Sequence, residues 1–504
     1  MNLTSLARPF FERRYQQIIQ NTQRVEEVQR SVLTRLLRQA AHTAWGRKYH
    51  YDQLHTYEDF AATVPVSTYE DLKAFIDRMR HGEADLLCKG RVKWYAKSSG
   101  TTNDKSKFIP VSQQGLRDTH SAGGRDALAI YLHHYPQSRI FNGKALILGG
   151  SHAPNYNLPG SLVGDLSAIL IENINPVVNL IRTPDKHTAL LPDFEEKRDR
   201  IARIAMRQHV TNLSGVPSWM LSVLTRVQEL SGESDLSRVW PDLEVFFHGG
   251  VSFTPYREQY KRIITSPGMH YMETYNASEG FFGLQVDPSD PSMTLMSDYG
   301  VFYEFIPLDT LGTPQQKALP LWQTETGVNY AMVISTSGGL WRYQIGDTVR
   351  FTDATRNRFV ISGRTKSFIN AFGEELIVDN AEKGLAQACR QTGAEVSEYT
   401  AAPVFMDDNG KCRHQWLIEF RRRPASIEEF ADILDKTLQN INSDYEAKRY
   451  KDITLQPLEI VEARENLFND WLKSCGKLGG QHKVPRLSND RRIIDPLLKL
   501  NAHS

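Results

Sequence analysis

The sequence predicts an α/β protein: a large N-terminal domain of mixed sheets flanked by helices, with a β-barrel-like part, and a small mobile α+β C-terminal domain. Apolar strands that end on glycine, such as KALILGG (144–150) and LEVFFHGG (243–250), are typical of a sheet whose carboxyl ends carry a site. From about residue 297 the pattern becomes β-rich, with turn signals at short intervals. Beyond residue 363, strand-like and helical runs alternate over about 130 residues, a normal domain size.

The bulk composition favours an enzyme of small molecules over a nucleic-acid or membrane protein. The 504 residues include 60 Lys and Arg against 59 Asp and Glu, so the net charge of +1 offers no general attraction to nucleic acid or an anionic membrane. The four cysteines form no CxxC pair, which argues against structural zinc and fits a reducing compartment. The N-terminus lacks the apolar run of a secretory signal, and no apolar stretch reaches the ~18 residues of a transmembrane helix. We therefore expect a cytoplasmic protein, and its oligomeric state stays open.

The N-terminal part is predicted to be helical. In residues 25–40, apolar side chains recur at three- and four-residue steps and mark one apolar face. A further helix is expected in STYEDLKAFIDRMRHG, where Ser67 and Glu70 have the spacing of a capping box. Ser112 is expected to cap the long helix that begins after it.

The stretch KSSGTTNDKSK (97–107) is expected to join two short strands, VKWYA (92–96) and KFIPVS (107–112). Hydroxyls, backbone N–H groups around a glycine and a nearby ammonium are what a polyphosphate requires. The stretch is no Walker loop, because it lacks GK[ST] and does not open a helix. The alternative is a solvated hairpin with a polar turn. The candidate phosphate ligands are Ser98, Ser99, Gly100, Thr101, Thr102 and Lys107, with Lys105 as a second source of charge.

The stretch YNASEGFFG follows another apolar strand and contains the next candidates. Glu279 is a hard oxygen ligand of the kind that Mg²⁺ prefers, and the ring of Tyr275 can lie against a flat base. The alternative is that Ser278 and Glu279 simply start a helix. Gly249 and Gly250 end a different strand, where they can let a base approach the backbone or can form a plain turn.

Two further motifs follow in the second half of the chain. In RYQIGD, Gly346 and Asp347 are expected to end a strand, and the carboxylate can accept hydrogen bonds from ribose hydroxyls. An ordinary β-turn is the alternative. GRTKS, with Arg364 and Lys366, has the composition of a hinge or of a plain linker. We place the domain boundary there.

These motifs are individually weak, but their order resembles the adenylate-forming superfamily of acyl- and aminoacyl-activating enzymes and luciferases. SSGTTNDKSK is similar to its phosphate signature, which more often has glycine where Asn103 and Asp104 stand. YNASEG is similar to its aromatic-and-glutamate signature, and RYQIGD to its ribose-aspartate signature. GRTKSFINAFGEEL is similar to the hinge signature, with Lys366 at the hinge position and Asn370 where a lysine is frequent.

Within that superfamily, the chain most resembles the acyl acid amido synthetases of the auxin-responsive Gretchen Hagen family of plants. The likeness is carried by SSGT, GVPSW (215–219), NSDYEAKR (442–449) and QHKVPRL (481–487), and it spans nearly the whole chain. It implies that a carboxylate attacks the α-phosphorus of ATP, giving an acyl-adenylate and pyrophosphate. An amino acid's amine then attacks the acyl carbon and AMP leaves.

The resemblance implies a large adenylating domain, residues 1–363, and a small lid domain, residues 364–504, that swings about Lys366 between half-reactions. Lys483, Lys366 and Arg364 would be catalytic, with Lys483 meeting the charge that develops during adenylation. Glu279 would hold Mg²⁺. ATP would be bound by Ser98, Ser99, Gly100, Thr101, Thr102, Lys107, Gly249, Gly250, Tyr275, Ala277, Ser278, Glu279 and Asp347.

The acid pocket is expected between the long helix after Ser112 and the segment 213–219. A buried arginine there would pair the substrate carboxylate in a bidentate manner, although charged residues on such a helix often form its solvated face. The candidate pocket residues are Arg117, His120, Val216 and Trp219, with Arg125 as a further possibility.

Two alternatives to an amide synthetase remain. A thioester ligase of the same superfamily would deliver the acyl group to coenzyme A instead of to an amino acid. A nucleotide-binding regulator that has lost catalysis is favoured by the Asn103-Asp104 departure, whereas Glu279 and the two-domain layout argue against it.

Overall fold

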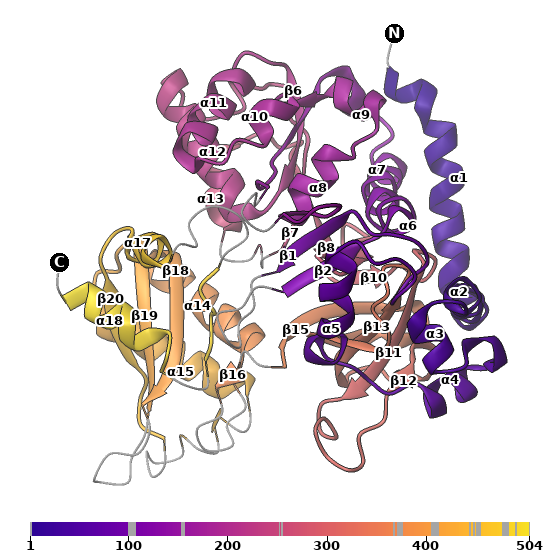
Figure 1. Cartoon of the computed structure of the whole chain (residues 1–504). Helices are drawn as coiled ribbons and strands as arrows, with labels where there is room; N and C mark the ends of the chain where they lie inside the picture. The colour runs from indigo at the N-terminus through magenta and orange to yellow at the C-terminus, as the bar shows by residue number, and fades with distance from the viewer. Residues whose placement is uncertain are drawn as a thin grey trace. The chain divides into compact units, whose positions relative to one another are not determined.

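The computed structural model describes residues 3–98, 107–152, 157–250, 253, 256–365, 368–369, 376–404, 413–442, 445–446, 449, 455–475, 483–488 and 491–502. The chain divides into two compact units (Figure 1). The first contains most of the chain up to residue 360. The second contains Gly346–Thr348 and most of the chain from Ile361 onward.

A twelve-stranded sheet runs through the first unit, in the order β12-β11-β13-β14-β15-β10-β9-β8-β7-β6-β3-β5. Strands β5, β3, β6, β7 and β8 are parallel neighbours, and β8, β9, β10 and β15 follow as antiparallel neighbours. The β-rich region that was expected to be barrel-like forms the other half of this sheet. The strands are β3 (Lys144–Ile147), β5 (Arg182–Thr183), β6 (Val210–Gly215), β7 (Val245–Gly249), β8 (His270–Ala277), β9 (Gly280–Leu284), β10 (Met293–Leu295), β11 (Val301–Pro307), β12 (Leu319–Pro320), β13 (Asn329–Thr336), β14 (Tyr343–Asp353) and β15 (Arg358–Arg364).

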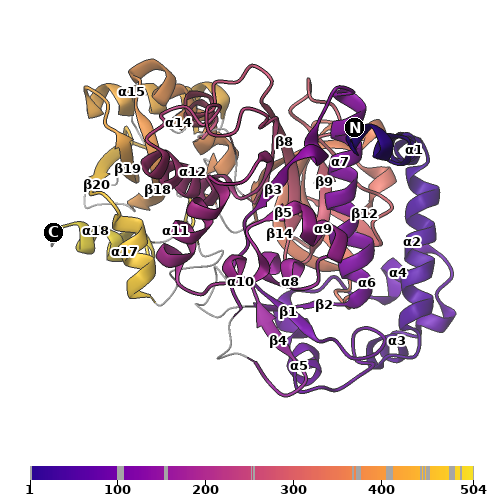
Figure 2. The same ribbon diagram turned by 90° about the horizontal axis from the view of Figure 1, so that it is seen from above.

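Side-chain alternation along β7 shows how helices cover both faces of the parallel half. Val245 and Phe247 pack in one apolar cluster with α1 and α7, whereas Phe246 packs in another with α11, α12 and α13. Successive side chains of a strand point to opposite faces, so the two groups of helices lie on opposite sides of the sheet (Figures 1 and 2). These helices are α1 (Leu3–Gln23), α7 (Ala122–His134), α11 (Phe194–Ala205), α12 (Pro217–Ser231) and α13 (Arg257–Ile263).

A smaller sheet has the order β2-β1-β4 and contains the hairpin whose loop is rich in hydroxyls. The hairpin packs against helices near the N-terminus in the largest apolar cluster, which also takes in β11, β13 and β14. These elements are β1 (Trp94–Ser98), β2 (Lys107–Val111), β4 (Leu162–Gly164), α2 (Val25–Ala40), α3 (Ala44–Lys48), α4 (Tyr57–Thr63) and α5 (Tyr69–Arg80). Three further short helices of this unit are α8 (Leu166–Glu172), α9 (Pro176–Ile181) and α10 (Lys186–Ala189).

The cap of α5 differs from the predicted one by one residue. Thr68 is the N-cap, and its backbone N–H donates to Asp71 Oδ2 at 2.7 Å. The predicted pair of Ser67 and Glu70 was wrong because Ser67 is used elsewhere: its hydroxyl donates to the Trp341 carbonyl at 2.7 Å. By contrast, the predicted cap at Ser112 is confirmed.

The helix after Ser112 has three consecutive parts: α6 (Gln113–Gly115), a π-helical turn over Leu116–Ser121, and α7. Such π segments are frequent at functional sites. Arg14 of α1 fixes this helix, since its Nε and Nη2 donate to Asp126 Oδ2 at 2.8 and 2.6 Å. Asp126 is fully buried and also accepts from the Tyr299 hydroxyl at 2.9 Å.

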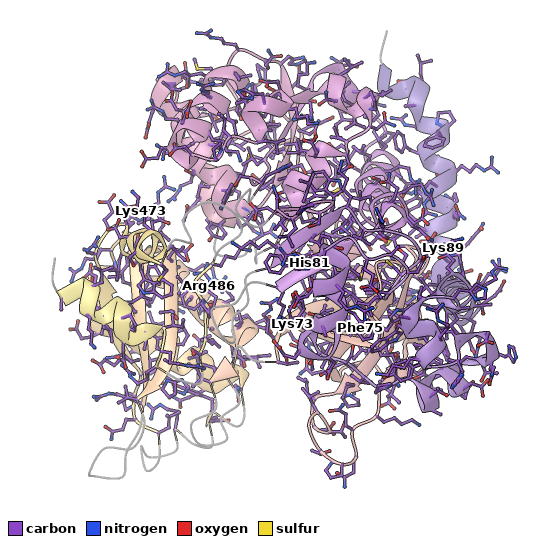
Figure 3. All side chains as sticks on the ribbon, viewed as in Figure 1. Lys73, Phe75, His81, Lys89, Lys473 and Arg486 are labelled. Atoms are coloured by element: carbon purple, nitrogen blue, oxygen red, sulfur yellow. The ribbon has the colours of Figure 1, made fainter. Side chains whose placement is uncertain are left out.

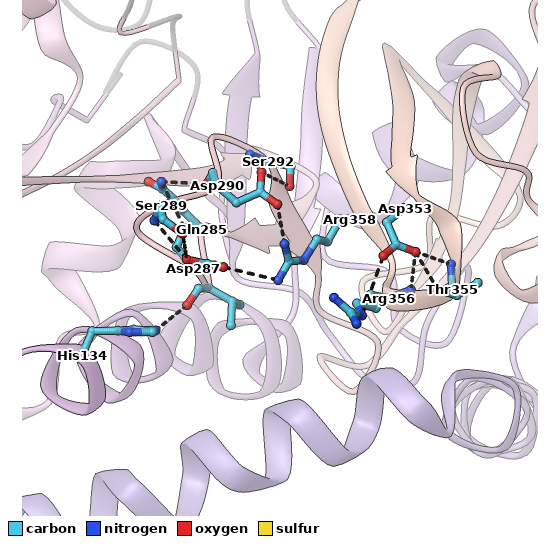
Figure 4. A network of polar contacts seen from close by, with 11 residues as sticks. His134, Gln285, Asp287, Ser289, Asp290, Ser292, Asp353, Thr355, Arg356 and Arg358 are labelled. Carbon is cyan, nitrogen blue, oxygen red and sulfur yellow. Dashed lines mark hydrogen bonds and ion pairs between the residues drawn. The ribbon is translucent and has the colours of Figure 1, made fainter.

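The connection from β9 to β10 contains the repeated sequence DPSDPS, whose side chains form a hydrogen-bonded network (Figure 4). Asp287 Oδ1 accepts from the Ser289 hydroxyl at 2.6 Å, and Asp290 Oδ1 accepts from the Ser292 hydroxyl at 2.7 Å. Arg358 of β15 forms ion pairs with both aspartates. These bonds fix the connection at one end of the β8–β9 hairpin, whose turn carries Glu279 at the other end.

The second unit contains a sheet of order β18-β19-β20 with helices on both faces. Trp416 and Ile418 of β19 pack with α14 and α15, whereas Leu417 packs with α17 and α18. A hairpin of β16 and β17 precedes α14. These elements are β16 (Phe368–Ile369), β17 (Leu376–Ile377), α14 (Val378–Thr392), β18 (Glu395–Val404), β19 (Arg413–Arg422), α15 (Ile427–Ile441), β20 (Glu459–Ala463), α17 (Leu467–Ser474) and α18 (Ile494–Ala502).

The motif NSDYEAKR has a structural use in this unit. Arg449 donates Nη2 to Asp435 Oδ2 at 2.7 Å, and the Tyr445 hydroxyl donates to Asp435 Oδ1 at 2.6 Å. Both the aspartate and the arginine are buried, so each charge offsets part of the cost of burying the other. Across the part of the chain that the structure describes, no helix combines the length and the apolarity that spanning a membrane requires.

Candidate active site

The β1–β2 hairpin confirms the predicted strand–loop–strand arrangement. Ser98 ends β1 and pairs in register with Lys107, which begins β2. Lys107 Nζ donates to the Tyr343 hydroxyl at 3.4 Å, so the base of the loop touches the first residue of β14. Ser99, Gly100, Thr101, Thr102 and Lys105 lie outside the described residues.

Glycine is favoured for a different structural reason at each of the two positions at the end of β7. A Cβ on Gly249 would lie 2.3 Å from the Thr274 carbonyl oxygen of β8, so only glycine allows the two strands to approach. Gly250 has φ of +81°, a left-handed conformation that favours glycine. The close strand packing therefore accounts for Gly249 independently of any bound base.

The YNASEG motif lies in the β8–β9 hairpin. Ala277 pairs with Gly280, so Ser278 and Glu279 form the turn between the strands. The alternative that these two residues start a helix was wrong. Ser278 is buried, and Glu279 is partly exposed at the tip of the hairpin.

Tyr275 belongs largely to the core. Its ring lies 5.1 Å from the ring of Phe282 and 6.0 Å from that of Phe359 on β15, and only 5% of the residue is exposed. Most of its face is therefore in contact with protein. The contact with Phe359 links β8 to the strand beside β14.

Asp347 lies inside β14 and not at its end, because the strand continues to Asp353. The prediction that Gly346 and Asp347 end a strand was wrong, and so was the β-turn alternative. Gly346 has φ of +89°, an irregularity within the strand. Arg364 Nε donates to Asp347 Oδ1 at 2.8 Å, so these two signature residues form an ion pair. Lys366 lies outside the described residues.

The short segment that carries Lys483 follows the edge of β18. The Ala401 N–H donates to the Arg486 carbonyl at 2.9 Å, and the Thr400 hydroxyl donates to the Pro485 carbonyl at 2.7 Å. Arg486 (Figure 3) places its guanidinium 4.8 Å over the ring of Tyr399. The backbone of this segment is therefore held in place close to Lys483.

The Lys483 side chain is exposed, but its amine lies in a crowded electrostatic environment. The surrounding protein atoms lower its pKa, and the guanidinium groups of Arg486 and Arg364 add to this effect. The carboxylates of Glu398 and Asp347 oppose it. Lys483, Arg364 and Asp347 thus influence one another within the second unit.

The four candidate residues for the acid pocket have different surroundings. Arg117 is exposed and pairs with the neighbouring Asp118, which is typical of a solvated helix face. His120 lies in the π-helical turn, is 7% exposed, and burial lowers the pKa of its imidazole to about 4, so the ring is neutral. Val216 is the N-cap of α12. Trp219 lines a hollow beside Lys197 of α11.

Several residues near these sites were not predicted from the sequence. Lys197 is buried and its Nζ donates to the Gly150 carbonyl at 2.8 Å, which anchors the loop after β3. Tyr343 stands within the quoted RYQIGD motif, and Tyr69 stands within the predicted α5. Their proximity to Lys107 depends on strands and helices that are distant in the sequence, so no local pattern could have indicated it.

A cluster of titratable side chains lies next to the end of β7. Glu273 of β8 pairs in register with His248 of β7. Burial raises the pKa of Glu273 to about 7, and Arg257 opposes this. Burial lowers the pKa of His248 to about 3, so its ring is neutral and stacks 4.1 Å from that of Phe253.

The raised pKa of Glu273 predicts a pH effect on stability. In the folded state this pKa lies above the unfolded value of 4.5, so the native protein binds more protons between the two values. The stability that this proton binding adds to the folded state is complete below pH 4.5 and is lost as the pH rises through about 7. Glu273→Gln stays neutral and should gain on the order of 1–3 kcal/mol over the wild type between pH 5 and pH 8. Denaturant midpoints across this range test it, with the exposed Glu325→Gln as control.

Three family models match the chain in order. The GH3 family N-terminal domain matches residues 14–269, the GH3 family central domain matches residues 294–364, and the GH3 family C-terminal domain matches residues 379–492. Together the matches extend from the first helix to the segment that contains Lys483.

The matches to known proteins, by sequence and by structure, cover nearly the whole chain. An indole-3-acetic acid-amido synthetase, GH3.8, from Oryza sativa subsp. indica is 26% identical over 94% of this chain and 90% of the rice protein. The solved structure of the GH3.15 acyl acid amido synthetase superposes with a TM-score of 0.78 and 19% identity, covering 96% of this chain and 94% of that one. A 2-hydroxyisobutyryl-CoA ligase in the postadenylation state has a TM-score of 0.62 and 14% identity, covering 94% and 92%. The predicted fold class is confirmed.

Proposed function

This chain belongs to the GH3 family, and we propose that it is an ATP-dependent acid-amido synthetase. It adenylates a carboxylic acid and then transfers the acyl group to the amine of an amino acid, forming a carbon–nitrogen bond. The observation that carries the proposal is the series of three family domains in order along the chain; Lys107, Asp347 and Lys483 lie inside them, whereas the hairpin of Glu279 lies between the first two matches.

In the first half-reaction, the acid's carboxylate oxygen attacks the α-phosphorus of ATP and pyrophosphate leaves. Phosphoryl chemistry depends mainly on positioning and on charge stabilisation. We assign Asp347 to the ribose of the nucleotide, and Arg364, Lys366 and Lys483 to catalysis, with Lys483 meeting the charge that develops during this step. The phosphates are assigned to Ser98, Ser99, Gly100, Thr101, Thr102 and Lys107, and the base to Gly249, Gly250, Tyr275, Ala277 and Ser278.

Magnesium is assigned to Glu279. The described residues contain no group of three or more metal-ligating side chains. Mg²⁺ commonly uses only one or two carboxylates and takes its other ligands from substrate phosphates and water. A single partly exposed carboxylate at a hairpin tip fits that requirement. When bound, the ion would neutralise phosphate charge.

In the second half-reaction, the amino acid's amine attacks the acyl carbon, the bond to phosphate oxygen breaks, and AMP leaves. We propose that the domain of residues 364–504 acts as a mobile lid with Lys366 at its hinge. A closed lid would exclude water from the mixed anhydride. For the acid pocket we retain His120, Val216 and Trp219, whereas the exposed Arg117 has the least support.

Acid-dependent exchange of labelled pyrophosphate into ATP tests the first half-reaction. The assay uses the full chain with Mg²⁺ and a panel of small carboxylic acids. We expect exchange with at least one acid and its loss in EDTA, with recovery on adding Mg²⁺. No exchange with any acid would favour the inactive nucleotide-binding relative.

The acceptor distinguishes the amide synthetase from the coenzyme A ligase. With the active acid, AMP release should depend on an amino acid and not on coenzyme A. Release that depends on coenzyme A would overturn the proposed acceptor, an outcome that the fold of the 2-hydroxyisobutyryl-CoA ligase makes worth testing. We propose a cytoplasmic enzyme that uses small-molecule substrates, without nucleic acid or membrane partners.

A further inference from the structure

Lys107 lies between two tyrosine rings of the first unit. Its Nζ is 5.9 Å from the ring centroid of Tyr69 and 5.9 Å from that of Tyr343. The Nζ also donates a long hydrogen bond of 3.4 Å to the Tyr343 hydroxyl. An ammonium within about 6 Å of an aromatic face is attracted by the ring quadrupole. At Tyr343 the ammonium lies beside the hydroxyl at the ring edge, so the lysine is oriented by the Tyr69 ring and the Tyr343 hydroxyl.

Tyr69 also holds the backbone beside this lysine. The Phe108 N–H donates to the Tyr69 hydroxyl at 3.0 Å. Tyr69 is the first residue of α5 and is 7% exposed, and α5 is itself packed against α3 through the edge contact of Phe75 with Trp45. Tyr69 thus fixes the start of β2 relative to a helix.

The backbone on both sides of Tyr343 is held by hydrogen bonds with Ser67. The Ser67 N–H donates to the Arg342 carbonyl at 2.8 Å, and the Gln344 N–H donates to the Ser67 carbonyl at 2.9 Å. These bonds connect the start of β14 to the residue that precedes α5's cap, and Tyr343 itself is fully buried. The starts of α5, β2 and β14 therefore converge on Lys107.

We propose that Tyr343 and Tyr69 are positioning residues that orient Lys107 toward the phosphates of ATP. A lysine side chain has many rotamers, and ordering it in advance reduces the entropy lost on binding. Tyr343 stands four residues before Asp347 on the same strand, so one strand would serve both the phosphate lysine and the ribose. This inference depends on the proposed function for the role of Lys107.

Tyr343→Phe removes the hydroxyl and keeps the ring. We expect it to raise the KM for ATP, and the Kd for ATP in calorimetry, about 3- to 10-fold while kcat stays within about twofold. Lys107→Met should give an equal or larger rise. In the double variant, Tyr343→Phe should add nothing further, because its effect acts through the lysine. Additive effects, or an unchanged Kd in Tyr343→Phe, would overturn the proposal.

Tyr330→Phe is the matched control. Tyr330 is buried in the neighbouring strand β13, and its hydroxyl accepts a hydrogen bond from the Glu325 N–H at 2.9 Å, away from Lys107. The Tyr330→Phe variant should leave the Kd for ATP unchanged. The two proposals can fail separately. A wild type that binds ATP without acid-dependent exchange would overturn the proposed function, but the Kd values of the variants would still decide the role of Tyr343. A wild type that binds no ATP overturns both.

Discussion

Glu304→Gln should lower the free energy of unfolding of the protein by about 3–5 kcal/mol, because it leaves a buried guanidinium without its counter-charge. Arg342 donates Nε and Nη2 to the two oxygens of Glu304 at 2.9 and 2.7 Å, and both side chains are almost fully buried. The Tyr57 hydroxyl donates to Glu304 Oε1 at 3.1 Å. The loss is measured from denaturant unfolding curves.

Two comparisons make this prediction specific. The double variant Glu304→Leu with Arg342→Met should recover part of the loss, because two apolar residues can replace a buried ion pair. The recovery should be incomplete, since Arg342 Nη1 also donates to the Ala61 and Val64 carbonyls. Glu258→Gln, which removes an exposed ion pair with Lys261, should change stability by no more than about 0.5 kcal/mol. Equal effects of Glu304→Gln and Glu258→Gln would contradict the assignment.

Lys483→Ala should slow the first half-reaction by about 10²–10³-fold, the usual loss when one group that stabilises developing charge is removed. The second half-reaction, started from preformed acyl-adenylate, should change little. Because the protonated amine is the active form, the rate of adenylation should fall as the pH rises through the pKa of Lys483. That pKa is lowered, so the fall should occur at a lower pH than for an ordinary lysine.

Lys473→Ala is the control for this experiment. Lys473 is an exposed lysine of α17 in the same unit (Figure 3), and its removal should leave both half-reactions unchanged. An adenylation rate in Lys483→Ala equal to that of the wild type would remove Lys483 from the site. A loss in both half-reactions would instead indicate a structural role for the segment on β18.

Local patterns predicted many elements correctly. Ser112 caps its helix because its side chain accepts from the N–H of Gly115, three residues away, and such contacts depend only on nearby sequence. The hydroxyl-rich loop was placed between two strands from their apolar pattern, and the register of Ser98 with Lys107 agrees. The same reasoning failed at Ser67, where two capping residues are adjacent and the Ser67 hydroxyl donates instead to the carbonyl of the distant Trp341.

Prediction also failed where the sheet decides the outcome. Gly346 and Asp347 have the composition of a turn, yet the strand continues through them with β13 and β15 on either side. Sheet pairing involves residues far apart in the chain, so local turn propensity does not reveal it. At Ser278 and Glu279 the turn after the strand was expected, and only the alternative of a helix start was wrong, since Ala277 pairs with Gly280 in a hairpin.

The sequence by itself determined the fold class, the order of the signature motifs and the family likeness, since strand and helix periodicity and short motifs are local properties. Only the tertiary structure decided which partner each polar residue of these motifs contacts. Arg342 and Tyr343 are neighbours in one motif, yet one is buried against Glu304 and the other faces Lys107. The physical reason is that the burial and the partner of a side chain depend on strands and helices that the chain brings together from distant positions.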